Sequence, residues 1–342
     1  MGDVSALDPP VVRPSQRRRR TLLWFAVIRV LVGLATLLVV SMLVFAATEV
    51  LPGDAASAVL GRSATPEQVE RLRAQMGLDR SAAQRYADWL TGLLTGDLGD
   101  SASGFASGAD IPIWGLIKGK LANTFILATI VTLLMIPLSL ALGVAAATRA
   151  GRAADHAITT SSLTVVSLPE FVIGSLLIIV FFTWLSLLPP VSLLAPGESP
   201  LEHPRLLVLP VLTLLAATLA GSTRMVRAGV IETMRSDYVR MAELNGLPHR
   251  RVVRRYALRN ALAPAIQVFG QNIQYLVGGI IVVEYLFSYP GIGKELVDAV
   301  AIRDVREVQT IAILVAAFCI FVNVVTDLLV VLLVPKLRTG HA

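Results

Sequence analysis

The chain has 342 residues, of which 55% are hydrophobic and only 16% are charged, and its formal net charge is +6. So few charged residues cannot cover the surface of a soluble domain, so the composition predicts a membrane protein with several spans. The basic excess does not indicate a nucleic-acid partner, because the arginines gather beside apolar segments, where orientation in a bilayer explains them. The one cysteine, Cys319, lies within an apolar run, which excludes an intrachain disulfide and a cysteine-cluster metal site.

Residues 1–23 form a polar tail that carries four consecutive arginines at positions 17–20. The apolar run that follows, residues 24–48, is long enough to cross a bilayer. A basic segment before an apolar run is also typical of a signal peptide, but no clear small-residue cleavage site precedes Glu49. We therefore predict a retained first transmembrane helix behind a basic cytoplasmic N-terminal tail, which orients the helix and contacts anionic lipid.

Residues 49–120 are predicted to form an external segment with short amphipathic helices. Thr65-Pro66-Glu67 is a helix start signal. Apolar residues then recur at roughly helical spacing between charged ones, namely Leu72, Met76 and Leu78, followed by Tyr86, Trp89, Leu90 and Leu93.

The second and third spans are predicted at about residues 121–148 and 156–188, joined by a short hydrophilic turn. Pro169 should bend the third span, and the next residue, Glu170, places a carboxylate near the middle of the membrane. An acid at this depth is by default a functional-site hypothesis. Two interpretations stay open: the carboxylate lines a translocation path and meets a substrate amine or cation, or it is a packing residue satisfied by the protein or by cavity water.

The fourth and fifth spans are predicted at about residues 206–227 and 261–283. The fifth span carries four amide side chains, Gln267, Gln271, Asn272 and Gln274. Amides are costly against lipid, so they should face other helices or a wet cavity. Hydrogen bonding between helices and lining of a path are equally open interpretations.

Residues 284–307 contain a sharp break, PGIG at 290–293, before a predicted amphipathic helix. The sequence GIGK at 291–294 is not a phosphate-binding loop, because the first glycine of that motif is missing and Glu295 stands where Ser or Thr would bind magnesium. The last span is predicted at about 308–334 and contains Asn323 and Asp327.

A cytoplasmic loop is predicted between the fourth and fifth spans, at residues 228–260, and the stretch 237–264 is the longest strongly basic interval between two apolar segments. Asp237 can cap a short helix that runs to residue 244, Asn245-Gly246 is typical of a left-handed helix stop, and Pro248 should open a second basic helix to about residue 260. The pattern predicts a helix-turn-helix on the membrane surface. It serves either as a docking element for a cytoplasmic partner or as a loop whose arginines meet only lipid phosphates.

Charge counts fix the expected orientation. Residues 223–260 hold nine Lys/Arg against three acids, whereas residues 49–120 hold seven against nine. The positive-inside rule therefore places residues 49–120 outside and the 228–260 loop in the cytoplasm. An all-α polytopic protein with six transmembrane helices satisfies this placement, with both termini in the cytoplasm and the 284–307 segment outside.

Two stretches of this loop, DYVRMAELNGL at 237–247 and YALRNALAP at 256–264, resemble the coupling-helix loop of ABC-importer permeases of the dipeptide, oligopeptide and nickel branch. The motifs LPGD, ATPEQ, MGLD and GDLG, in that order after the first span, are also similar to that branch. The resemblance covers about residues 25–338. Against the wider importer consensus only Ala242 and Gly246 fit cleanly, and 243–245 lacks the usual basic character.

The resemblance implies residue roles. It implies an ATPase-coupling set: Asp237, Tyr238, Arg240, Ala242, Glu243, Gly246, Arg259, Asn260 and Pro264. It also implies that 284–307, with Pro290, Gly291 and Gly293, is an extracellular scoop-like segment.

The resemblance further implies a plasma-membrane permease that forms a heterodimer with a homologous second permease. Two ATP-binding subunits with Mg-ATP would dock beneath, and an external substrate-binding lipoprotein would deliver the solute. This chain itself would hold no cofactor and catalyse no reaction. Peptides are the expected solute, with nickel, haem and small glycosides as alternatives.

Two other classes of function stay open at this stage. A proton-driven secondary transporter would use Glu170 and Asp327, but the sequence has no visible inverted repeat. A membrane anchor or sensor would recruit a cytoplasmic protein through the 237–264 loop without transport. The sequence contains no Walker A loop, and its four histidines and one cysteine show no catalytic triad or metal-ligand cluster. We therefore expect that this chain does not itself supply the energy for transport.

Overall fold

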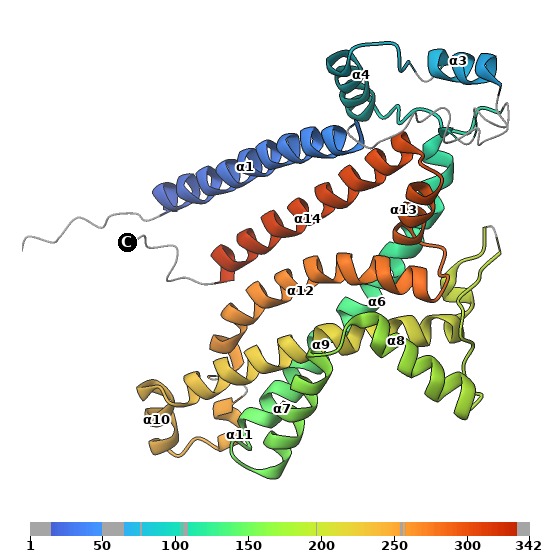
Figure 1. The fold of residues 1–342 in the computed structure, drawn as a ribbon. Helices are drawn as coiled ribbons and strands as arrows, with labels where there is room; N and C mark the ends of the chain where they lie inside the picture. The colour runs from blue at the N-terminus through green and yellow to red at the C-terminus, as the bar shows by residue number, and fades with distance from the viewer. Residues whose placement is uncertain are drawn as a thin grey trace, which may run out of the picture.

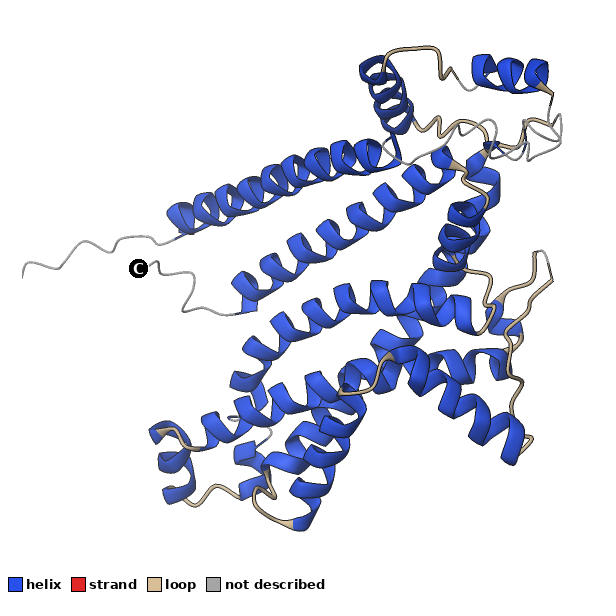
Figure 2. Ribbon diagram, viewed as in Figure 1, coloured by secondary structure: helices blue, strands red, loops and turns tan. Residues whose placement is uncertain are grey.

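The computed structural model describes residues 15–49, 65–75, 77–102, 104, 109–195, 197–253, 256 and 258–333. Helices form nearly all the regular structure of these residues, and no strand element occurs among them (Figure 2). The prediction of an all-α polytopic membrane protein is thereby confirmed.

Figure 1 shows the helices in chain order. They are α1 (Ser15–Glu49), α3 (Pro66–Gln75), α4 (Ala82–Thr95), α6 (Ile113–Ala147), α7 (Ala153–Val166), α8 (Glu170–Ile178), a π-helix η1 (Ile179–Trp184), a 3-10 turn η2 (Pro200–Glu202), α9 (Pro204–Met234), α10 (Asp237–Leu244), α11 (His249–Val252), α12 (Leu258–Leu286), α13 (Ile292–Ala301) and α14 (Val305–Leu333). Five described helices are long and apolar enough to cross a membrane, namely α1, α6, α9, α12 and α14. The pair of α7 and α8/η1 makes a sixth span if it is counted as one.

Several helices are longer than the predicted spans. Helix α6 begins at Ile113 rather than 121, α9 continues to Met234 rather than 227, and α14 begins at Val305 rather than 308. The reason is that hydropathy marks only the hydrocarbon-compatible part of a helix, whereas backbone hydrogen bonding continues into the polar turns at either end. The expected second helix of the basic loop, from Pro248 to about residue 260, is described only in part: α11 runs from His249 to Val252, and Val253 and Tyr256 are also helical. Residues 254, 255 and 257 lie outside the described part.

The third span is broken more sharply than a proline bend. Helix α7 ends at Val166, α8 starts at Glu170, and the two axes differ by 104°. Pro169 sits at the break with extended backbone angles and precedes the first residue of α8, because proline cannot donate the hydrogen bond that would continue α7. The break leaves Glu170 in the first turn of a helix that begins inside the bundle.

Helix α9 is the centre of the bundle and contacts α6, α7, α8 and α12 (Figure 1). The largest core cluster joins α6, α9 and α12 through residues that include Leu127, Leu214 and Leu276. The crossing of α6 and α9 is close, because a Cβ on Gly143 would lie 2.6 Å from Val226 Cγ1. Small residues at such crossings are typical of helix pairs in membranes, where packing rather than hydrophobic burial holds helices together.

A buried ion pair fastens α7 to α9. Asp155, which is 2% exposed, accepts hydrogen bonds from Arg227 Nε at 2.6 Å and Nη2 at 2.7 Å. The backbone N–H of Gly151 also donates to Asp155 at 2.9 Å. Two parallel bonds from a guanidinium fix orientation as well as distance, so this pair holds the 148–153 turn against the last third of α9.

Helix α1 packs along α14 and is otherwise almost unburied. A Cβ on Gly33 would lie 2.9 Å from Ile320 Cγ2, and Arg29 Nε lies 3.2 Å from Asp327 Oδ2. Asp327, one of the two acids considered for a proton path, is therefore paired with the arginine of the neighbouring helix. At the other end of α1, the Tyr86 hydroxyl lies 2.8 Å from Ser41 Oγ and ties α4 to the bundle.

The turn between α12 and α13 is built around a buried carboxylate. Glu284 is fully buried and accepts hydrogen bonds from Thr124 Oγ1 at 2.6 Å, Gly293 N at 2.7 Å and Lys294 N at 3.2 Å. A Cβ on Gly291 would lie 2.0 Å from Glu284 Oε1, so only glycine fits at that position. The carboxylate thus satisfies the first N–H groups of α13 and sets its direction.

A second set of bonds holds the same turn from α6. Asn123 Nδ2 donates to the Pro290 carbonyl at 2.9 Å, and the Tyr289 hydroxyl donates to the Asn123 carbonyl at 2.8 Å. Burial, and then the charge of Glu284, raise the pKa of Tyr289, so it stays a protonated donor. Lys120 on α6 also pairs with Glu295 on α13. The residues Pro290, Gly291 and Gly293 are therefore parts of a rigid corner.

We expect Glu284→Met to loosen this corner and Glu284→Gln to loosen it less. Methionine has a similar volume but leaves the Gly293 and Lys294 N–H groups without an acceptor, at a cost of about 1–3 kcal/mol per buried donor. Amide hydrogen exchange of α13, followed by mass spectrometry in detergent, should rank the variants as Met fastest, Gln next and wild type slowest. Unchanged protection in Glu284→Met would contradict the assigned role, and Glu202→Gln, on an exposed turn, is the control.

Candidate functional site

The basic segment forms a short hairpin at one end of the bundle. Helix α9 ends at Met234, the chain turns at Ser236, and α10 runs from Asp237 to Leu244. Ser236 occupies the N-cap position, so the expectation that Asp237 caps the helix is corrected by one residue. Asp237 lies in the first turn, where its charge favours the helix dipole.

Helix α10 ends in a Schellman turn. The Leu247 N–H donates to the Ala242 carbonyl at 3.3 Å, and the Gly246 N–H donates to the Glu243 carbonyl at 2.9 Å. Gly246 has φ +78°, which is the left-handed conformation expected of a helix stop. A Cβ at Gly246 would meet nothing within 4 Å, so its requirement for glycine is conformational rather than steric.

The two faces of α10 differ. Val239 and Ala242 are buried and form a small core with Val252 of α11. Three apolar side chains at helical spacing point away from this core: Tyr238 is 46%, Met241 62% and Leu244 75% exposed. The hairpin is therefore internally packed and presents an apolar ridge, flanked by the exposed Arg240 and Glu243, at the end of the molecule.

The remaining residues of the expected coupling set lie in α12. The backbone of Arg259, Asn260 and Pro264 forms the first two turns of that helix. Their side chains are outside the described part. The structure therefore places α10 and the start of α12 at the same end of the bundle, but it does not test contacts among these side chains.

Glu170 and α12 meet near the break in the third span. The Tyr275 hydroxyl donates to Glu170 Oε1 at 2.5 Å. A Cβ on Gly279 would lie 3.6 Å from the same oxygen, so α12 also approaches the carboxylate closely at this glycine. Tyr275 was not among the residues expected from the sequence, because a tyrosine in an apolar span carries no signal of its partner.

The four amides of α12 divide into two pairs. Asn272 Nδ2 donates to Ser222 Oγ on α9 at 2.6 Å, and Gln274 Nε2 donates to Asn323 Oδ1 on α14 at 2.8 Å. These two amides take part in hydrogen bonding between helices. Gln267 and Gln271 are exposed instead. They belong to an exposed stripe along one face of α12, which we call the α12 stripe and which consists of Gln267, Gln271, Tyr275, Gly278, Val282 and Tyr285.

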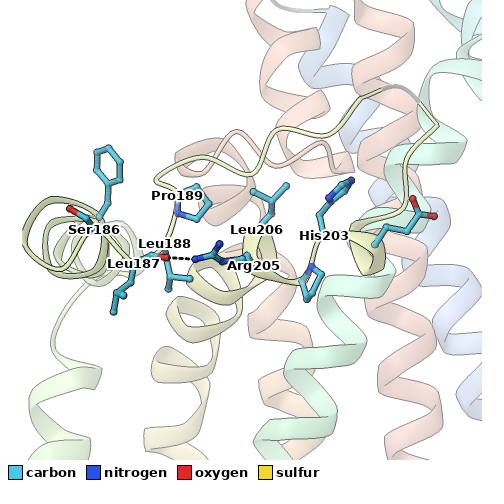
Figure 3. Close-up of a pocket in the computed structure, with 10 residues that line it drawn as sticks. Ser186, Leu187, Leu188, Pro189, His203, Arg205 and Leu206 are labelled. Atoms are coloured by element: carbon cyan, nitrogen blue, oxygen red, sulfur yellow. Dashed lines mark hydrogen bonds between the residues drawn. The ribbon is translucent and has the colours of Figure 1, made fainter.

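A cavity of about 660 Å³ lies between the end of η1 and the start of α9 (Figure 3). These segments are at the end of the bundle away from α10 (Figure 1). Arg205 crosses it and donates from Nη2 to the Leu187 carbonyl at 3.1 Å. Apolar residues such as Leu188 and Leu206 form much of its wall. None of the residues expected from the sequence lines this cavity, so it lies apart from both the hairpin and the Glu170 region.

Comparison with known proteins agrees with the architecture. Residues 139–339 match the family model described as binding-protein-dependent transport system inner membrane component, and residues 22–141 match the model of the N-terminal part of such components.

Individual relatives align over nearly their whole length. A probable peptide ABC transporter permease protein of Sinorhizobium fredii is 30% identical over 310 residues, which cover 91% of this chain and 97% of the relative. A putative peptide transport system permease protein of Brucella abortus is 32% identical over the same shares. The glutathione transport system permease protein GsiC of Escherichia coli is 34% identical over 313 residues, 91% of this chain and 98% of the relative.

The chain therefore belongs to the family of binding-protein-dependent transport system inner membrane components, as a multi-pass permease subunit of an ABC importer that works with ATP-binding and substrate-binding partners.

Proposed function

We propose that this chain forms half of the membrane path of an ATP-driven importer of di- or oligopeptides. A homologous second permease completes the path, two ATP-binding subunits that hold Mg-ATP dock against α10, and an external lipoprotein delivers the peptide. The observation that carries this proposal is the α10 hairpin, because its apolar ridge is exposed at the end of a membrane bundle and its turn is rigid. A groove in an ATP-binding subunit would bury Tyr238, Met241 and Leu244.

The choice of peptides rests on the relatives. Two of those named above are described as peptide permeases and one as a glutathione permease, and glutathione is itself a tripeptide. Nickel, haem and small glycosides are less favoured, since none of these names mentions them.

Charge and geometry together support one orientation in the membrane. The start of α1, the end of α14 and the α10 hairpin lie on the same side of the molecule (Figure 1). Residues 223–260 hold nine Lys/Arg against three acids. We assign this side to the cytoplasm, with both termini, and the side of α4 and α13 to the exterior.

Helix α9 would transmit movement of the ATP-binding subunits to the rest of the bundle. This helix is continuous from Pro204 to Met234, and only Arg235 and Ser236 separate it from α10. A displacement of α10 by the ATP-binding subunits therefore acts on the end of a helix that contacts four others and is joined to α7 by Asp155–Arg227. A rigid turn at Gly246 is required so that the force moves the bundle rather than unfolding the hairpin.

A proton-driven mechanism is less consistent with the contacts. Such a path needs acids that are open to protonation along its length. Asp327 instead lies on α14 with its carboxylate 3.2 Å from Arg29 of α1, whereas Glu170 lies on α8.

The function is tested by uptake into proteoliposomes that contain the purified complex. Labelled tripeptide should enter when the binding protein is outside and ATP-Mg is on the side of α10, and a protonophore should have no effect. Uptake that needs a proton gradient but no ATP would contradict the proposal. Uptake of nickel or haem in place of peptides would keep the class of transporter and change its solute.

We expect Gly246→Val to uncouple the complex and Gly246→Asn to spare it. The site has open space but needs φ near +78°, which costs a β-branched residue about 1–2 kcal/mol and asparagine much less. In Gly246→Val, either the ATP-binding subunits are lost on purification or ATP is hydrolysed without uptake. Equal uptake by both variants would show that the turn at Gly246 does not transmit force from the ATP-binding subunits to the bundle.

A further inference from the structure

We propose that Glu170 recognises the free α-ammonium group of a peptide during passage, and that Tyr275 is the positioning residue that holds this carboxylate when no peptide is present. The inference rests on the proposed function, because it concerns the path of the same importer. It assigns a substrate feature to a residue whose role the sequence left open between path lining and packing.

The carboxylate is only half satisfied. The Tyr275 hydroxyl donates to Oε1 at 2.5 Å, and within the described residues no other hydrogen bond or ion pair reaches Glu170. Two other carboxylates of the helical core are more fully bonded, since Asp155 has a bidentate arginine and Glu284 accepts three hydrogen bonds. One neutral donor is a weak partner for a charge at this depth.

The surroundings leave room for a ligand beside the carboxylate. Tyr275 is 56% exposed, and Glu170 itself is partly exposed. On α12, Gly278 and Gly279 follow Tyr275 by about one turn, and a Cβ on Gly278 would meet nothing within 4 Å. No long side chain from this part of α12 therefore covers Glu170, and the α12 stripe continues the polar surface through Gln271 and Gln267.

The break in the third span separates Glu170 from the helix that precedes it. Glu170 is the first residue of α8, directly after the 104° break, so its backbone is not carried by α7. An acid in the first turn also stabilises a helix by itself, and this purely structural role is the competing explanation. That role predicts no effect on which peptides pass.

An ammonium group fits the open position better than the tyrosine hydroxyl. The hydrogen bond from the tyrosine hydroxyl to the carboxylate is already charge-assisted, but an ammonium adds the attraction of a full opposite charge, which the neutral hydroxyl lacks. An incoming ammonium would therefore displace Tyr275 from Oε1 or bind at Oε2, and either outcome neutralises the charge. A free peptide amino terminus and a lysine side chain share this chemistry, so the test must separate them.

The experiment compares import of trialanine with import of N-acetyl-trialanine by the reconstituted complex. We expect Glu170→Gln to reduce the ratio of free to acetylated uptake about tenfold relative to wild type, the size of one charge-assisted hydrogen bond. The same binding protein serves both complexes, so its own selectivity cancels. An N-acetylated peptide with an internal lysine reports whether a side-chain cation substitutes for the terminal amino group.

Two further variants make the result specific. Tyr275→Phe should keep the preference for the free amino group, because it removes the competing donor and leaves the carboxylate. Glu198→Gln, on an exposed loop outside the path, should match wild type. An unchanged ratio in Glu170→Gln, with the subunits still co-purifying, would overturn the inference while leaving peptide import intact. Failure of the wild-type complex to import either peptide would instead reject the proposed function.

Discussion

A charge or backbone polar group inside an apolar helix bundle must find its partner within the protein, and this constraint organises the molecule. Asp155 is met by the two nitrogens of Arg227, and the result is a fixed contact between α7 and α9. Glu284 is met by the backbone of α13, and the result is a fixed corner at the opposite end. Glu170 is partly exposed and, among the described residues, accepts a hydrogen bond only from Tyr275, so the carboxylate keeps acceptor capacity for a ligand.

Asp155, Glu170 and Glu284 lie on three different helices, all of which pack against α9. Helix α9 contacts the helices that carry all three, and it leads directly to the α10 hairpin. On the proposed function, movement of the hairpin would reach the break in the third span through the two-residue turn at Arg235 and Ser236 and then through α9. Helix α1 stands outside this group of helices, since it packs mainly on α14 and is held there by Gly33 and the Arg29–Asp327 pair.

Much of the fold could be predicted from the sequence, because hydropathy and helix punctuation are local. The apolar spans, the break at Pro169 and the left-handed turn at Gly246 are all set by residues next to one another in the chain. The helix ends were wrong by several residues, because packing of polar turns extends helices beyond their apolar part. The contacts of Glu284 and Asp155 could not be predicted, since Thr124 and Arg227 are distant in sequence and neither residue type specifies its partner. Asn272 and Gln274 were assigned to a path or to helix contacts with equal weight, and only the distances to Ser222 and Asn323 decide between the two.

The central claim is that α10 is the surface through which partners drive this chain. The most direct test is purification of the tagged chain from its native host in mild detergent, with mass spectrometry of the proteins that accompany it. The account predicts a homologous permease, ATP-binding subunits and a substrate-binding lipoprotein with the wild-type chain, and loss of the ATP-binding subunits alone from Leu244→Asp, which places a charge on the most exposed residue of the ridge. Recovery of the chain alone, or retention of the ATP-binding subunits by Leu244→Asp, would contradict it.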